Sequence, residues 1–152
     1  MNQTTVAIES PLTDDARALI AGSEVAMRAV FSEDECFTFS PEELDKPNIA
    51  FFVARQNAAA MGCVALVSNA EYGEVKRLFV PDSARGLGIA KTLMTHLESH
   101  ACSNELPKIN LETGPQLTAA VSLYTKLGYK TCTAFGSYKA IPASLFMEKP
   151  LC

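Results

Sequence analysis

Short apolar runs divide the first half of the chain into candidate strands. Residues 4–9 alternate weakly and are rich in β-branched side chains, as is typical of a strand. Two longer apolar runs, 49–55 and 60–68, are separated by the four residues 56–59, and this pattern predicts a hairpin. Residues 74–80 form another apolar run. The pattern therefore predicts one N-terminal strand followed, after a helical segment, by three consecutive strands.

The first helical segment lies between residues 13 and 31. Thr13 is a candidate N-cap, and apolar side chains recur at helical spacing as far as Phe31. Gly22-Ser23 weakens the middle of this segment and could split it into two helices. Ser40 and Glu43 form a capping box for a further short helix within the irregular stretch 32–48.

Helices alternate with strands in the second half of the chain. Helical spacing predicts helices at 88–102 and at about 117–126, with Gly128 as the C-cap of the latter. The remaining strands are expected at 108–112, 129–134 and 144–148. No linker or repeat interrupts this order, so we expect one domain over residues 1–152. Its class is α/β (α+β), with a mixed sheet and helices on its faces.

A glycine-rich turn lies between the strand at 74–80 and the helix at 88–102. It reads Arg85-Gly86-Leu87-Gly88-Ile89-Ala90. Unpaired N–H groups and the helix dipole favour an anion at a helix N-terminus, and glycine allows close approach of the backbone. The turn therefore predicts a phosphate site. The basic residues that flank it and suit a polyanionic ligand are Lys76, Arg77, Arg85 and Lys91.

Other functional motifs fit the chain poorly. The turn lacks the G-K-[ST] of a Walker A loop and the third glycine of a dinucleotide fingerprint. His96 and His100 share a helix face, but the acid between them is misplaced for a zinc motif, and no third ligand is apparent. No G-x-S-x-G elbow is present. We therefore expect neither a metal site nor a serine hydrolase.

Composition limits the classes of binding partner and the cellular compartment that we expect for the protein. The chain has 152 residues and a net charge of −4 without an evident basic face, which argues against nucleic-acid binding. No apolar run approaches the ~20 residues of a membrane span. The N-terminal residues lack a signal segment, so a cytoplasmic location is expected. The five cysteines are odd in number and lack C-x-x-C spacing, which suggests neither a disulfide framework nor a zinc site.

Two motifs resemble those of the GNAT acetyltransferase superfamily. Arg85, Gly88 and Ala90 match R-x-x-G-x-A, the loop that grips the pyrophosphate of acetyl-CoA in that family. Residues 120–129, Ala-Val-Ser-Leu-Tyr-Thr-Lys-Leu-Gly-Tyr, resemble its A-x-x-x-Y-x-x-x-G-[FY] segment. The resemblance implies a mostly antiparallel sheet of six or seven strands, with strands four and five splayed. It also implies acetyl-CoA as co-substrate, without a metal, and allows a homodimer.

The same resemblance suggests roles in acyl transfer. Glu74 stands six residues before Val80, where the family often places its base, and Tyr124 matches the family's general acid. The alternative readings are a solvated carboxylate and a core tyrosine. Backbone groups of Leu78, Phe79 and Val80 would bind the pantetheine arm. Many members carry asparagine where this chain has Leu117, so a hydrogen bond to that arm is absent or comes from Gln116 or Thr118.

Acceptor contacts are assigned to the cleft beside these groups. The candidates are Arg77, Glu112 and Tyr138. Arg77 is included because a guanidinium can bind a carboxylate through two hydrogen bonds. Arg77 could equally form a structural bridge with Glu112. The resemblance thus implies an N-acetyltransferase that acts on a primary amine of a small molecule or amino acid derivative. The alternatives are a protein lysine or N-terminal acetyltransferase, and a non-catalytic acyl-CoA sensor.

Overall fold

The computed structural model of the protein describes residues 3–32 and 39–152. Seven strands form one mixed sheet in the order β1-β2-β3-β4-β5-β7-β6, in which only β4 and β5 are parallel. The strands are β1 (Thr5–Ile8), β2 (Ile49–Gln56), β3 (Ala59–Ser68), β4 (Gly73–Phe79), β5 (Lys108–Thr113), β6 (Lys130–Cys132) and β7 (Leu145–Pro150). The helices are α1 (Asp14–Arg28), α2 (Pro41–Leu44), α3 (Ile89–Ser103) and α4 (Thr118–Lys126). The predicted mostly antiparallel sheet is confirmed.

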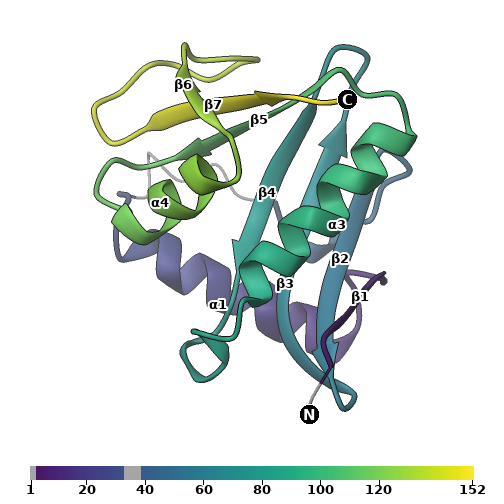
Figure 1. Ribbon diagram of the computed structural model, residues 1–152. Coiled ribbons are helices and arrows are strands. Elements are labelled where there is room, and N and C mark those ends of the chain that lie inside the picture. The colour runs from purple at the N-terminus through teal and green to yellow at the C-terminus, as the bar shows by residue number, and fades with distance from the viewer. Residues whose placement is uncertain (1–2, 33–38) are drawn as a thin grey trace.

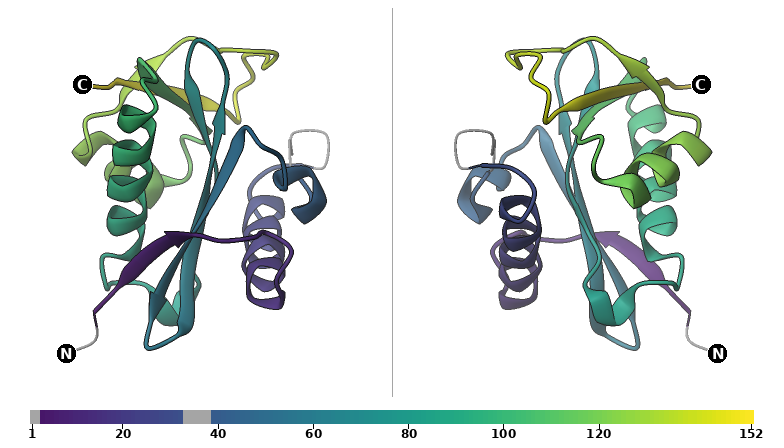
Figure 2. Two further views of the ribbon diagram at one scale, coloured as in Figure 1. Left: turned by 90° about the vertical axis from the view of Figure 1, so that its right-hand side faces the viewer. Right: turned by 90° about the vertical axis from the view of Figure 1, so that its left-hand side faces the viewer.

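Helices cover both faces of the sheet (Figures 1 and 2). α1 and α2 lie on one face, and α3 and α4 lie on the other. Each face has its own apolar core: Leu19 and Ile20 of α1 are buried in one, and Leu93 and Leu97 of α3 in the other. Within residues 3–32 and 39–152, no helix combines the length and apolar character needed to cross a membrane.

α1 is one continuous helix, so the split that Gly22-Ser23 made possible does not occur. Thr13 caps it as predicted, accepting a hydrogen bond from the Ala16 N–H at 3.1 Å. Gly22 is required by packing, because a Cβ there would lie 2.7 Å from the ring of Phe79. Ser23 is buried and its hydroxyl donates to the Ile20 carbonyl at 2.7 Å, so its polar group is satisfied within the helix.

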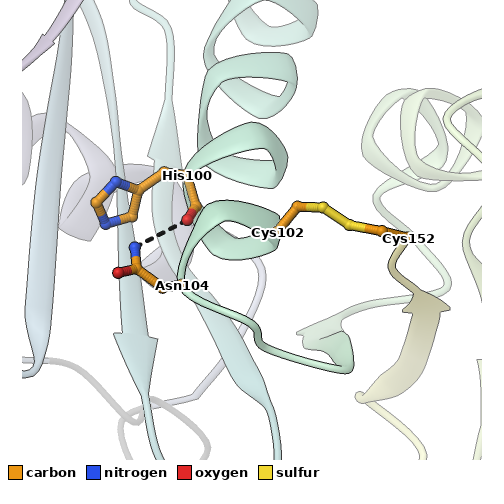
Figure 3. Close-up of a disulfide and its surroundings, with 4 residues drawn as sticks. All are labelled: His100, Cys102, Asn104 and Cys152. Atoms are coloured by element: carbon orange, nitrogen blue, oxygen red, sulfur yellow. Dashed lines mark hydrogen bonds between the residues drawn. A yellow bond between two sulfur atoms is a disulfide. The ribbon is translucent and has the colours of Figure 1, made fainter.

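The C-terminal end of the chain is joined to α3. β7 lies between β5 and β6, and the Leu151 N–H donates to the Pro107 carbonyl at 2.9 Å. This course brings Cys152 beside Cys102 on the last turn of α3, and the two form a disulfide with their Cα atoms 6.3 Å apart (Figure 3). The sequence spacing predicted no disulfide, because only the order of the strands brings the two residues together.

A bulge in β4 is held by Arg77. The pairing of β3 with β4 shifts between Cys63 and Ala65, so β4 has one extra residue there, and Arg77 has a left-handed φ of 59°. Its guanidinium donates to Ser23 Oγ at 2.9 Å and to the Phe39 carbonyl at 2.9 Å. It also pairs with Glu24 of α1 at 3.2 Å. These buried contacts connect α1 with β4.

Replacement of Arg77 by alanine should therefore destabilise the fold. The change leaves the Phe39 carbonyl and Ser23 without the guanidinium, and we expect the free energy of unfolding to fall by about 3 kcal/mol in urea denaturation. Arg17→Ala is the control, because Arg17 pairs with Glu42 at the surface and should matter little. Equal small losses in both variants would show that Arg77 does not hold the bulge.

Candidate active site

The cleft begins where β4 and β5 separate. These parallel strands pair at only three positions, from Gly73–Ile109 to Val75–Leu111. Beyond Val75 the edge of β4 has no partner in β5. Leu78, Phe79 and Val80 therefore border a cavity of about 570 Å³ between the two strands. The splayed strands implied by the family resemblance are present.

The glycine turn forms one end of this cleft. Gly86 and Gly88 have left-handed φ values of 82° and 75°, and an added Cβ on either would meet no atom within 4 Å. Glycine is therefore required by backbone conformation rather than by crowding. The Thr92 N–H bonds the Gly88 carbonyl at 3.1 Å, so the N–H groups of residues 89–91 lack acceptors within α3. They border a hollow of about 180 Å³ that could hold a phosphate group.

Two of the four basic residues expected around this turn lie elsewhere. Arg85 and Lys91 border the hollow, and the Arg85 side chain is 61% exposed, with an ion pair to Asp82 at 2.7 Å. Arg77 is turned toward α1, and Lys76 toward Glu74. The bulge in β4 explains why Lys76 and Arg77 lie away from the turn, because it brings these two successive side chains to the face of the sheet that α1 covers.

Glu74, Lys76 and Tyr138 form a partly buried polar cluster in the cleft. The Tyr138 hydroxyl donates to Glu74 Oε2 at 2.5 Å, and Lys76 Nζ contacts that hydroxyl and lies 3.2 Å from Glu74 Oε2. Lys76 also lies over the rings of Phe39 and Tyr138, at 5.1 and 5.0 Å. Burial, and then the negative charge of Glu74, raise the pKa of Tyr138 well above its usual range, so Tyr138 is a hydrogen-bond donor to Glu74.

Aromatic packing fixes the position of Tyr138, which comes from the connection between β6 and β7. Its ring contacts Phe135 and Phe146, with centroids 5.1 and 5.7 Å away. Tyr72, just before β4, packs edge-on against Phe135 at 5.5 Å. This cluster holds a late segment of the chain against the start of β4, which is why Tyr138 can reach Glu74.

Glu112 lies next to this cluster, near the end of β5. It accepts a hydrogen bond from the Ser144 hydroxyl at 2.6 Å. Among the described residues it has no ion-pair partner within 4 Å. Burial is the main cause that raises its pKa, and the nearby charge of Glu74 adds to the effect, while Ser144 and Lys76 oppose it. The sequence allowed an ion pair between Arg77 and Glu112. Both residues lie in the described part of the chain, and this ion pair does not form, because Arg77 pairs with Glu24 instead.

Tyr124 lines the cleft from α4. Gly128, with φ 99°, ends α4 by a Schellman motif in which the Tyr129 N–H donates to the Tyr124 carbonyl at 3.0 Å. This turn places the two tyrosine rings edge-on, with centroids 5.7 Å apart. The Tyr124 hydroxyl has no hydrogen-bond partner within the described residues. Burial raises its pKa, so the phenol is protonated at neutral pH.

The cleft passes from one face of the sheet to the other. Val75 and Leu111 are buried in the core beneath α3, so the neighbouring side chains Glu74 and Glu112 lie on the opposite face, that of α1. Tyr124 packs in the same apolar core as the α3 residues, and its helix α4 lies on the α3 face of the sheet (Figure 2). We call the two ends of the cleft the α1 side and the α4 side. Glu74 and Tyr124 thus border one cavity from opposite sides of the sheet.

Some site residues were not predicted from sequence. Ser144 carried no recognisable signal, and Lys76 was assigned to the glycine turn instead of to Glu74. Leu117, the departure from the family pattern, lines the cleft, whereas neither Gln116 nor Thr118 does. Within residues 3–32 and 39–152, no three His, Cys, Asp or Glu side chains are grouped so that they could share a metal ion.

The comparisons with known proteins agree with this geometry. The model of the Acetyltransferase (GNAT) family matches residues 17–129. The IAA acetyltransferase of Azospirillum brasilense is 38% identical to this chain, over 99% of this chain and all of its own length.

Solved structures resemble the fold as well. A Klebsiella pneumoniae protein assigned as an acyl-CoA N-acyltransferase superposes with a TM-score of 0.82 and 31% identity, over 99% of each chain. The PaiA N-acetyltransferase of Thermoplasma acidophilum, solved with coenzyme A, has a TM-score of 0.76. It shares the fold at 20% identity, over 97% of this chain and 99% of its own. This chain therefore belongs to the GNAT acetyltransferase family, and the protein is an acyltransferase.

Proposed function

We propose that the protein transfers the acetyl group of acetyl-CoA to a primary amine of a small molecule or amino acid derivative. The observation that carries the proposal is the position of Glu74 and Tyr124, which border one cavity from opposite sides of the splayed strands. A thioester placed between them would have a carboxylate on the side of an incoming amine. It would have a protonated phenol on the side of its sulfur. The glycine turn would bind the pyrophosphate of the same molecule.

Acyl transfer to an ammonium acceptor needs a base near the nitrogen and an acid near the sulfur, and the cleft has a candidate group for each. An ammonium acceptor first loses a proton to Glu74, directly or through water, and the neutral amine attacks the thioester carbonyl. The oxyanion that forms would accept hydrogen bonds from unpaired backbone N–H groups at the end of β4. The carbon–sulfur bond then breaks, and Tyr124 gives its proton to the departing thiolate. The nitrogen, which still carries one proton more than the amide, loses it to water, and exchange with water restores the phenol of Tyr124 and the carboxylate of Glu74. The products are an acetamide and CoA.

Two features support Glu74 as the base. Its side chain is 14% exposed and oriented by two partners, Lys76 and Tyr138. Glu71, by contrast, is an exposed carboxylate outside the cleft.

The acceptor is not fixed by the names of the relatives, so the panel of acceptors to be assayed should contain IAA as well as amines and peptides. Release of the CoA thiol across that panel tests the reaction. Binding of CoA without turnover of any acceptor would favour the sensor function instead.

Tyr124→Phe should lower kcat by about 100-fold, because a positioned general acid typically contributes roughly 10²–10⁴-fold. The affinity for CoA, measured by calorimetry, should change little, since the ring remains. Tyr129→Phe is the control, because the Tyr129 hydroxyl donates to Glu98 at 2.9 Å outside the cleft lining. Equal losses of rate and affinity in Tyr124→Phe would rule out the acid role.

Glu74→Gln should remove the acidic limb of the pH–rate profile. A general base works only when ionised, so the wild-type rate should fall as the pH decreases, whereas an amide cannot titrate. The profile of kcat at saturating acceptor should be measured for the wild type, for Glu74→Gln and for the exposed control Glu71→Gln, because kcat/KM would also report groups that only bind the acceptor. A Glu74→Gln variant that retains the acidic limb would exclude Glu74 as the base.

Arg85→Ala should weaken CoA binding about tenfold, because an exposed charge-assisted hydrogen bond to phosphate is lost. The loss of affinity caused by Arg85→Ala should nearly vanish for a pantetheine ligand that lacks the pyrophosphate. Calorimetric titration with both ligands separates these effects, with Lys126→Ala on α4 as the control. Similar weakening for both ligands would contradict a pyrophosphate contact.

A further inference from the structure

The cations that line the cleft are already committed to other groups. Within the described residues Lys76, Arg77 and Arg85 line the main cavity, and Lys91 borders only the hollow at the glycine turn. Arg77 is held by Ser23, Glu24 and the Phe39 carbonyl, and its side chain is 2% exposed. Arg85 lies at the phosphate end. Residues 33–38, which the structure does not describe, contain neither lysine nor arginine.

The α1 side of the cleft therefore has a surplus of negative charge. Lys76 balances one carboxylate, that of Glu74, at 3.2 Å. Glu112 is the second carboxylate, and it has no ion-pair partner within 4 Å among the described residues. Two acidic side chains therefore face one base, so this side lacks the positive charge that would balance both carboxylates when they are ionised. An anionic group that entered here would meet two carboxylates and, among the residues that the structure describes in the cavity lining, no available cation.

Apart from Ser23, whose hydroxyl is bonded to the Ile20 carbonyl and to Arg77, the described side chains that α1 and the residues just after it contribute to this side are apolar. Ala26, Met27 and the buried Phe31 line it from α1 and the residues just after that helix. An apolar wall beside a surplus carboxylate is complementary to a molecule with a hydrocarbon body and one cationic end. A body of this kind gains free energy by burial, whereas a charged body would lose its hydration without a partner.

We propose that the acceptor is an apolar primary amine without a carboxylate beside its nitrogen, and that Glu112 binds its ammonium group next to Glu74. This inference rests on the proposed function and narrows its acceptor class by excluding free α-amino acids. Glu112 acts in binding, and Glu74 takes the proton. The raised pKa of Glu112 agrees with this role, because a cation beside a partly buried carboxylate would relieve the cost of its charge.

The test compares phenethylamine with phenylalanine, which share a ring and an amine of comparable basicity and differ in the carboxylate. CoA thiol release should give a kcat/KM at least about tenfold higher for phenethylamine, since the carboxylate of phenylalanine has no partner and meets like charge. Equal or better use of phenylalanine would overturn the inference while leaving the acetyltransferase proposal intact.

Glu112→Gln should raise the KM for phenethylamine about tenfold and change kcat much less. It should also reduce the preference over phenylalanine, and Glu112→Asp should restore part of it. Glu148→Gln is the matched control, because Glu148 lies on β7 outside the cleft lining and pairs with Lys108. A purely structural role of Glu112 would lower kcat and leave the preference unchanged, which would contradict the inference.

Binding of the two ligands to the CoA complex separates the inference from the proposed function. Calorimetry should show tighter binding of phenethylamine than of phenylalanine to the wild type, and a reduced difference in Glu112→Gln. That result without any turnover would support the acceptor class and refute the acetyltransferase proposal. Failure of phenethylamine to bind more tightly than phenylalanine would refute the acceptor class.

Discussion

The short pairing of β4 with β5 is the constraint on which the site depends. The parallel ladder ends at Val75–Leu111, and beyond it the exposed edge of β4 becomes one wall of the cleft. The bulge at Arg77 lies just past this point and imposes a left-handed φ, which costs roughly 1–3 kcal/mol for a residue with a side chain. Buried hydrogen bonds from Arg77 to α1 and to Phe39 offset this cost, so the opening is maintained by the packing of a helix far away in sequence.

The two sides of the cleft differ in charge. The turn at residues 85–90 offers unpaired N–H groups, a helix N-terminus and Arg85, all of which favour a polyanion. The α1 side offers Glu74 and Glu112 with a single paired lysine. A polyanionic donor and a cationic acceptor would therefore be directed to opposite ends of one cavity, and the reacting carbonyl would lie between them.

The features predicted correctly from sequence are those encoded by neighbouring residues. The glycine turn, the helix that follows it, the Thr13 cap and the C-cap at Gly128 each depend on a few consecutive positions. The errors concern contacts between distant segments. Gly22 is a helix break in isolation, but in the fold it admits the ring of Phe79. Cys102 and Cys152, 50 residues apart, meet only because β7 is inserted between β5 and β6. The roles of the individual site residues remain predictions.

The α1 side shows why acceptor choice is harder to predict than the donor. Glu74 and Tyr138 are 64 residues apart, and Glu112 is held by Ser144, 32 residues away. The hydroxyl that orients Glu74 is that of Tyr138, which lies in the connection between β6 and β7 and borders this side of the cleft. A change in that connection would therefore alter the orientation of Glu74 together with the space for the acceptor. The phosphate end would remain intact, because it is built from one continuous strand, turn and helix.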